Sequence, residues 1–449
     1  MDFREENKHV FNIWLAKRVG LYQMFDPGTA RYRGKNVYHI ALTFIVLYLG
    51  VIATMMNVSG IYYWKDNMPI SIDYFWKAET WLFVFFKMWI VVYRSTDIWD
   101  CLSITRYGFT SFGYRNTRTL DRWRERSVRF TTAVTVIYLT SLVFYMAGSL
   151  AFREDVILVK NHDGSVGYYH QNVMNFYFAV SDSTYNAHYN TFFFVEAATA
   201  VLLTMLFLIF DILLITMCFA TCCQMQLVGC EFESFGHDKP FGDDPRRSPI
   251  GEHEFSDYTD ERKNVFKERV SMYYDELKTI VLDHQAVIKK YENLLSLFEL
   301  AMLLQIFVSS ITLIILWFIF IMSFSNDDRF VVSDIIVKKM IFLIPSLSYQ
   351  IYMECYLFGL LHNQKDSVIF ALYSSNWTEM CMRCKKLILL TMEMNNANHI
   401  KLKFTRTKIV NLEMFFKDMV PKIIPMYTYE YVVYRVFVSR LVSQTQTKI

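Results

Sequence analysis

The sequence lacks the short motifs by which many enzymes are recognised. It contains no glycine-rich phosphate-binding loop, no nucleophile elbow and no metal-binding pair of histidines. Cys381 and Cys384 have the spacing of zinc ligands, but no pair and no histidine near them completes a site. We therefore expect no enzymatic activity, no bound metal and no cofactor.

Basic residues are nearly missing from every second gap between the apolar segments. Seven such segments can be drawn, at 38–59, 73–93, 128–151, 193–220, 297–322, 339–361 and 423–439. Seven basic residues precede the first segment, only Lys65 follows it, and seven arginines lie between Arg94 and Arg126. Because cationic loops resist translocation, the basic gaps are predicted to be cytoplasmic. This pattern predicts an all-α membrane protein with seven transmembrane helices, a cytoplasmic amino terminus and an extracellular carboxyl terminus.

Cysteine is missing from the gaps predicted to face outward. All eight cysteines lie in, or beside, the basic gaps. A reducing cytosol keeps such thiols free, so no structural disulfide is expected.

The first 37 residues also lack the apolar core and cleavage site of a signal peptide, so the first span is expected to direct insertion. The net charge of +3 follows from orientation and does not indicate a nucleic-acid partner.

The predicted spans differ in how much charge they carry. The second contains Lys77, Glu79 and Lys87, the fourth Glu196 and Asp211, and the sixth Glu354. Charges near span ends can extend to the interface, which is the interpretation for Lys77 and Glu79. Asp211 follows a long apolar run and is expected to face a protein interior or a wet cavity.

The seventh segment is the most polar, with Glu430 and Arg435 after Pro421 and Pro425. It is interpreted either as interfacial or as lining an aqueous path, and the ionisable residues favour the second alternative.

The gap between the fourth and fifth segments contains two kinds of sequence. Residues 236–260 are rich in proline and charge and are predicted to be a disordered linker. An apolar seam with alternating four- and three-residue spacing then leads into the fifth segment; it contains Phe266, Val270, Tyr273, Leu277, Ile280, His284, Val287, Tyr291, Leu294 and Phe298. The seam must be buried, either within one subunit or in a cytoplasmic bundle where subunits meet.

Two stretches resemble insect odorant receptors. One is LKTIVLDHQAVIKKYENLLSLFELAMLLQIFVSS, and the other is ALYSSNWTEMCMRCKKLILLTMEMNNANHIKLKFTRTKIVNLEMFF. The resemblance implies a tuning subunit of an odorant-gated, non-selective cation channel, which forms a heterotetramer with an olfactory co-receptor in the plasma membrane of sensory neurons. Small volatile odorants and membrane lipid are the other implied partners. A gustatory-type channel and a metabotropic seven-span receptor without a pore remain alternatives.

The resemblance also assigns regions of the chain. Residues 1–37 are expected to be cytoplasmic, 38–220 to hold spans one to four with an outer ligand pocket, and 221–296 to hold the linker and seam helix. Residues 297–361 are expected to hold spans five and six, 362–422 a cytoplasmic anchor, and 423–449 the pore-lining span and an extracellular tail. The implied subunit anchor comprises Phe266, Val270, Leu277, Ile280, His284, Trp377, Leu412 and Phe415.

Within the regions that the resemblance assigns, residue type and helical spacing indicate candidate ligand and pore residues. Tyr145, Gly148 and Phe152 share a helix face in the outer half of the third span, and the full ligand set is Thr80, Trp81, Val84, Tyr145, Gly148, Phe152, Phe342 and Tyr349. Met426, Tyr429, Val432 and Val436 lie near one face of the seventh span. The resemblance to the family implies that Val432 and Val436 form an apolar gate.

Overall fold

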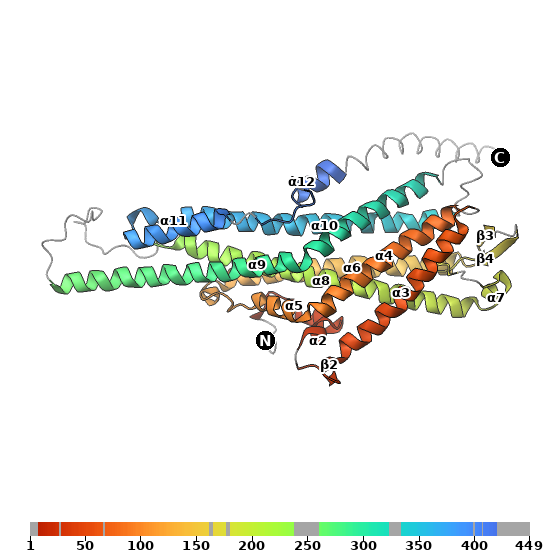
Figure 1. The fold of residues 1–449 in the computed structure, drawn as a ribbon, viewed down its shortest axis with the longest axis horizontal. Coiled ribbons are helices and arrows are strands. Elements are labelled where there is room, and N and C mark those ends of the chain that lie inside the picture. Colours follow the sequence, from red (N-terminus) through yellow and green to blue (C-terminus); the bar gives the residue numbers. More distant parts are fainter. Residues whose placement is uncertain are drawn as a thin grey trace.

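Long helices running side by side form an elongated molecule (Figure 1). The computed structural model describes residues 8–26, 28–65, 68–160, 165–176, 180–237, 260–322, 334–397, 400–405 and 407–419. The side chains of residues 69, 260–270, 322, 334–339, 341, 342, 396, 397, 418 and 419 lie outside this description. The predicted helical fold is confirmed.

Six of the seven predicted apolar segments lie within long helices. These are α3 (Val37–Tyr63), α4 (Met68–Tyr93), α6 (Thr117–Ala151), α8 (Tyr189–Ser234), α9 (Asp260–Met322) and α10 (Asp334–Tyr373). Asn36 caps α3 by accepting a hydrogen bond from the Tyr38 amide at 2.9 Å. Gly60 lets α4 approach α3 closely, since a Cβ there would lie 3.1 Å from the Phe75 ring. The seventh segment lies outside the described residues.

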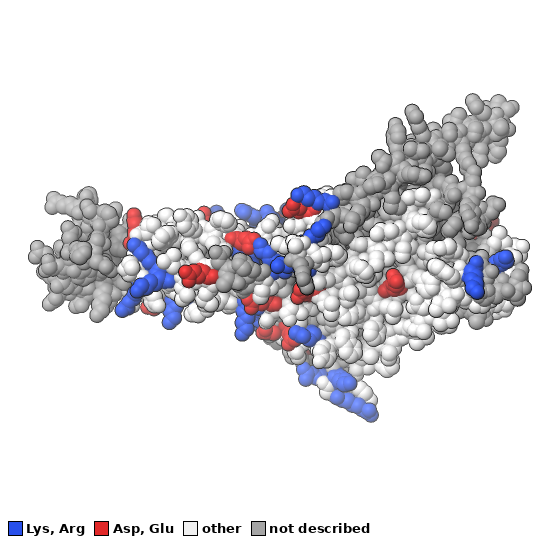
Figure 2. Space-filling view, turned by 45° about the horizontal axis from the view of Figure 1, so that its top comes forward, with Lys and Arg blue, Asp and Glu red and all other residues white. Residues whose placement is uncertain are grey.

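The surface around α3 and α6 is apolar in the manner of a membrane protein. Among the described residues, four helices contain an apolar stretch long enough to cross a membrane: α3, α6, α8 and α9. Phe44, Val51 and Ile61 of α3 are largely exposed. Figure 2 shows a broad area with few charges, and most Lys, Arg, Asp and Glu lie to one side of it. Such a large apolar surface is suited to lipid.

A bundle of α8, α9, α10 and α11 (Met382–Ala397) extends beyond the apolar region (Figure 1). The seam residues Leu277, Ile280 and His284 are buried inside this bundle within one chain. The structure therefore accounts for the seam by packing within the subunit, because α8, α10 and α11 all contact α9. The exposed apolar side chains of the bundle are a different set: Met272, Leu282, Phe370, Tyr373, Met382, Leu389, Leu390 and Met394.

Short elements join the helices. Before α3 lie α1 (Ile13–Arg18), α2 (Leu21–Phe25) and the hairpin β1 (Arg31–Tyr32) and β2 (Lys35–Asn36), and after α4 lie α5 (Ser95–Leu102) and the 3-10 turns η2 (Ser103–Thr105) and η3 (Gly113–Arg115). An antiparallel hairpin, β3 (Val156–Lys160) and β4 (Val166–His170), pairs Val156 with His170 and precedes α7 (Asp182–Ala187). The described chain ends in η6 (Trp377–Glu379), α11, α12 (Leu412–Met414) and the π-turn η7 (Phe415–Met419).

All eight cysteine thiols are free. Cys381 and Cys384 lie beside the start of α11 with their Sγ atoms 3.3 Å apart. No group of three metal-ligating side chains occurs among the residues that the structure describes.

Two buried histidines make the helical bundle sensitive to acid. Burial and the nearby Lys365 lower the pKa of His284 to about 4. Burial, Lys401 and Lys365 lower the pKa of His362 to about 4, although Asp366 opposes this. The Nε2 atom of His362 accepts a hydrogen bond from the Leu402 amide at 3.1 Å, which requires that nitrogen to be unprotonated.

We expect the purified protein to lose thermal stability as the pH falls from about 6.5 to about 4. Because the pKa of each histidine is lower in the folded state, the unfolded chain binds more protons between pH 6.5 and pH 4. Each histidine therefore lowers the free energy of unfolding by on the order of 3 kcal/mol as the pH falls through this range. His284→Leu should flatten the pH dependence of the melting temperature in detergent. The exposed histidine variant His237→Gln is the control and should leave it unchanged. An identical pH profile for His284→Leu and the unmodified protein would contradict this account.

Candidate functional site

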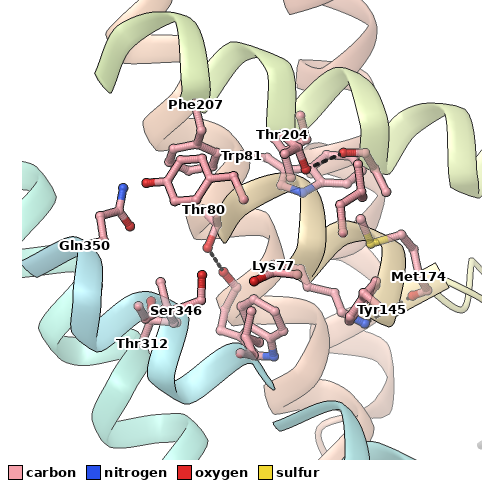
Figure 3. A pocket seen from close by; sticks show the side chains of 18 residues that line it. Lys77, Thr80, Trp81, Tyr145, Met174, Thr204, Phe207, Thr312, Ser346 and Gln350 are labelled. Atoms are coloured by element: carbon pink, nitrogen blue, oxygen red, sulfur yellow. Dashed lines mark hydrogen bonds between the residues drawn. The ribbon is translucent and has the colours of Figure 1, made fainter. Parts of the chain in front are cut away.

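A cavity of about 190 Å³ lies between five of the long helices. Its walls are mainly apolar, and the aromatic side chains of Trp81 and Phe207 are among the lining residues labelled in Figure 3. The lining residues are Trp76, Lys77, Thr80 and Trp81 of α4, Tyr138, Ser141, Leu142 and Tyr145 of α6, Met174 of the loop after β4, Ala200, Leu203, Thr204 and Phe207 of α8, Thr312 of α9, and Leu343, Ser346, Leu347 and Gln350 of α10. An apolar cavity with a few polar groups suits a small organic ligand.

The predicted ligand residues lie in and around this cavity. Thr80, Trp81 and Tyr145 line it. Val84 is buried in the core one turn farther along α4 and does not line the cavity. Gly148 and Phe152 of α6 do not line this cavity. Phe152 is the C-terminal cap of α6 and a Cβ on Gly148 would meet nothing within 4 Å, so their role as ligand residues stays a prediction.

On α10, the lining position is Gln350 rather than its neighbour Tyr349. Tyr349 is half-buried and its ring lies 6.4 Å from that of Tyr352. Successive helical residues point about 100° apart, so a shift of one position moves a side chain off the cavity wall. The Phe342 side chain lies outside the described residues.

A buried ion pair lies at one end of the cavity. The Nζ atom of Lys87 is 3.2 Å from Oδ1 of Asp211, and both side chains are 0% exposed. The Lys87 ammonium also lies 5.1, 4.8 and 4.6 Å from the ring centroids of Phe83, Phe207 and Phe210. Three aromatic faces and one carboxylate therefore surround the cation, which is the arrangement a buried charge needs.

Asp211 connects this ion pair to the cavity wall. The Tyr138 hydroxyl donates to Oδ2 of Asp211 at 2.5 Å, and the Gln350 amide donates to the same oxygen at 3.4 Å. Tyr138, Gln350 and Phe207 all line the cavity, so one cluster of buried groups on α4, α6, α8 and α10 fixes the positions of cavity residues. We call the end of the cavity beside Asp211 its deep end.

Glu354 adds a second carboxyl group to this cluster. It is 0% exposed, and its neighbours are the charged side chains of Lys87 and Asp211 and the side-chain amide of Gln305. Lys87 therefore lies near two carboxyl groups, each on a different helix.

A loop covers the other end of the cavity and is held by Glu196 of α8. The Glu196 carboxylate accepts hydrogen bonds from the backbone amides of Met174, Asn175 and Phe176 at 2.6, 2.9 and 2.8 Å. The Tyr185 hydroxyl donates to it at 2.9 Å. Three successive amides around one anion form a nest, which fixes the backbone of residues 174–176.

Lys77 helps to hold the same loop, and the interpretation that it extends to the interface is wrong. Its side chain is only 4% exposed, because it pairs with Asp73 and donates to the Met174 carbonyl at 3.1 Å. Glu79, by contrast, is exposed.

Sequence reasoning did not identify several cavity residues. Thr312, Ser346 and Gln350 carry no distinctive spacing. Tyr138 could have been found, because it lies two turns from Tyr145 on the same face of α6. The intramembrane charges Lys87 and Asp211 were visible in the sequence, but their pairing was not.

The remaining predicted sites are only partly described. Met426, Tyr429, Val432 and Val436 lie outside the described residues, as do the side chains of Phe266 and Val270. Trp377, Leu412 and Phe415 are half-buried, and the Phe415 ring contacts Tyr352 at 5.7 Å between centroids.

Comparisons with known proteins agree with this architecture. A family model described as 7tm Odorant receptor matches residues 67–419. The structure of the insect olfactory receptor OR5 from Machilis hrabei superposes with a TM-score of 0.65 at 14% sequence identity, covering 94% of this chain and 98% of that one. The structure of the same receptor in complex with eugenol gives a TM-score of 0.64 at 14% identity with the same coverage. No curated protein sequence matches the chain significantly.

Proposed function

The chain belongs to the 7tm odorant receptor family, and from that premise we propose that it is the tuning subunit of an odorant-gated, non-selective cation channel. A small volatile ligand binds in the cavity, and its binding opens a central pore. The subunit acts with an olfactory co-receptor in a heterotetramer in the plasma membrane of sensory neurons. The observation that carries this proposal is the cavity itself, which is mainly apolar and bordered by a buried polar cluster.

The proposed ligand site is supported by its size and composition. Burying apolar area is worth about 25 cal/mol per Å², so an aromatic and aliphatic cavity can hold a ligand that offers little to hydrogen-bond. The insect olfactory receptor of the same fold is described in complex with eugenol, itself a small aromatic molecule.

The proposed topology has seven spans with a cytoplasmic amino terminus. It is supported by the alternation of basic gaps and by the six long described helices. The seventh span, at 423–439, would line the pore, with Met426 and Tyr429 on the pore face and Val432 and Val436 as the apolar gate.

The proposed assembly uses the outside of the helical bundle. Leu277 and Ile280 are buried within one chain and cannot contact another subunit. Contact between subunits is therefore made by exposed apolar side chains such as Met272, Phe370 and Leu390. Exposed apolar groups on a surface that also carries many charges are suited to a protein interface.

Filling the cavity should reduce the potency of agonists in proportion to the volume added. Ala200 lines the cavity and is 3% exposed. We expect Ala200→Val, Ala200→Leu and Ala200→Phe to raise the half-maximal agonist concentration progressively, by roughly 10- to 100-fold for phenylalanine. The matched control is Val201→Phe, the next position on α8, which is exposed and does not line the cavity, and it should leave the dose response unchanged. Equal effects of Ala200→Phe and Val201→Phe at equal surface expression would place the ligand elsewhere.

Recording membrane current from cells expressing this chain tests the channel proposal. Agonist should evoke a non-selective cation current when the chain is expressed with the co-receptor, and cells expressing only the co-receptor serve as the control. A response that needs intracellular second messengers, with no current in excised patches, would instead support a metabotropic receptor.

A further inference from the structure

A second cavity, of about 750 Å³, lies where the chain enters the first long helix. Its walls come from α2, the hairpin β1–β2, the first turns of α3, the end of α4 and the start of α5. These elements lie together in Figure 1, and α2 contacts both α3 and α5. On the proposed topology this place is the boundary between the membrane and the cytosol, so we call it the interfacial cavity.

One part of the wall of the interfacial cavity is polar and carries positive charge. Arg31 and Lys35 of the hairpin line it, and both side chains are exposed. Asp26 supplies the one carboxylate of the described lining, and its Oδ1 atom accepts a hydrogen bond from the Gly28 amide at 2.9 Å. In Figure 2 a group of Lys and Arg side chains projects from the lower edge of the molecule, where the hairpin lies in Figure 1. Two cations and one carboxylate leave this part of the cavity positive.

The basic groups of this part are available to an anion. Neither Arg31 nor Lys35 forms an ion pair with another residue that the structure describes. Ser95 and Thr96, in the first turn of α5, add two hydroxyl groups to the same wall. A guanidinium, an ammonium and hydroxyl groups are the side-chain groups that commonly bind phosphate.

The remaining polar side chains of the wall are enclosed or engaged within the protein. The Nε2 atom of His39 is buried, and the Thr43 hydroxyl donates to the His39 carbonyl at 2.7 Å. The Asn36 amide donates to the carbonyls of Gln23 and Met24 at 2.9 and 3.1 Å. Asn36 thereby fixes the end of α2 against the start of α3, and none of these groups is assigned to the ligand.

The other part of the wall is apolar and continues along α3. Ile40, Phe44 and Leu47 follow one another on one face of this helix, and Val92 faces the cavity from the end of α4. Phe44 is 68% exposed and Leu47 is 56% exposed. Because α3 is apolar enough to cross a membrane, this face meets lipid chains. The interfacial cavity therefore joins a basic part to a surface suited to hydrocarbon.

We propose that the interfacial cavity binds one phospholipid of net negative charge from the cytoplasmic leaflet, with its phosphate at Arg31 and Lys35 and an acyl chain along Phe44 and Leu47. Basic pockets between membrane helices on the cytoplasmic side recognise anionic headgroups. A volume of about 750 Å³ greatly exceeds the roughly 30 Å³ of a water molecule, so a free ion would leave most of it unfilled. The proposal rests on the topology given under the proposed function and is independent of channel activity.

Two lipids with identical chains and different headgroups test the proposal. Dioleoyl phosphatidylserine carries a net negative charge, and dioleoyl phosphatidylcholine does not. Binding is measured on the purified full chain in detergent, by native mass spectrometry and by thermal stabilisation. Phosphatidylserine should bind at concentrations roughly 30-fold lower, as two basic groups near a membrane surface provide. Glycerophosphoserine, which is the same headgroup without chains, should neither bind nor stabilise the protein at the same concentration.

Neighbouring basic residues of the hairpin provide matched variants. Arg31→Gln and Lys35→Gln each remove one positive charge from the cavity wall, and each should reduce the preference for phosphatidylserine by about fivefold. Arg33→Gln is the control, because Arg33 lies over the Tyr32 ring and does not line the cavity. It should leave the preference within about twofold. All three positions are exposed, so the melting temperature without lipid should stay unchanged.

Three results would overturn the lipid site. One is equal binding of the two lipids, and another is binding of glycerophosphoserine at the same concentration, which would indicate a site for phosphate alone. The third is an equal effect of Arg31→Gln and Arg33→Gln, which would indicate a general attraction of the basic hairpin to anionic lipid. The expected lipid pattern without any agonist current would leave the site standing and the channel function wrong. Agonist current without the lipid pattern would mean the reverse.

Discussion

Asp211→Asn should remove most of the folded protein from the cell surface. The substitution leaves the Lys87 ammonium fully buried without its carboxylate at 3.2 Å. Breaking a buried ion pair by removing one partner costs about 3–5 kcal/mol, a large part of a typical folding free energy of about 5–15 kcal/mol. The measurements are surface biotinylation and the monodisperse fraction in detergent.

The double variant Lys87→Met with Asp211→Asn should recover a large part of this loss. It removes both charges together, and buried pairs replaced by neutral side chains are often no less stable. The control is Asp97→Asn in the exposed pair with Arg94, where both side chains are more than 40% exposed and the effect should be below about 1 kcal/mol. Normal surface expression of Asp211→Asn would show that Lys87 is compensated by another group, with Glu354 as the first to examine.

Glu196→Ala should have the second largest effect, on both folding and ligand response. It leaves the amides of Met174, Asn175 and Phe176 without their shared acceptor. Each unpaired buried amide costs about 1–3 kcal/mol, so the loop over the cavity should lose its fixed position. We expect reduced surface expression and, in the receptors that remain, agonist potency lowered by at least about tenfold.

Two further substitutions distinguish an effect of the loop at residues 174–176 on ligand response from a general loss of folding stability. Glu196→Gln keeps one acceptor oxygen and should give an intermediate defect. Asp182→Ala also removes a carboxylate that binds a backbone amide, that of Tyr168 at 3.1 Å, but at an exposed position. It should leave agonist potency unchanged. If Glu196→Ala and Asp182→Ala behave alike, the amide nest has no special role in ligand response.

The long helices could be predicted because each one follows from a continuous stretch of the sequence. A run of apolar residues of membrane-spanning length appears directly in the sequence, and α3 and α8 contain the corresponding predicted segments. The cavity was predictable only in part. Tyr145 was on the correct face, but the cavity continues from it toward Tyr138 rather than toward Gly148, because the neighbouring helices decide which turn of a helix is covered.

The contacts of the buried polar groups could not be predicted from the sequence. Lys87 and Asp211 were each noticeable as charges in apolar segments, yet they are 124 residues apart in the chain and no pattern links them. Glu196 binds amides 20 to 22 residues earlier, with helix α7 between them in the chain, and no sequence pattern indicates this contact. The seam on α9 predicted burial correctly but could not say whether its partner was the same chain.

The pairing of Lys87 with Asp211 also constrains the order in which the protein is made. On the proposed topology the ribosome delivers α4 first, and 124 residues must follow before Asp211 exists. At about 5–20 residues per second this interval is roughly 6–25 seconds. During it, Lys87 would have no carboxylate partner on α8, and a lysine in a lipid-exposed helix costs up to about 2.5–3.5 kcal/mol, the value at the helix centre. We therefore expect α4 to remain in contact with the insertion machinery until α8 arrives, and the two helices to leave it as a pair.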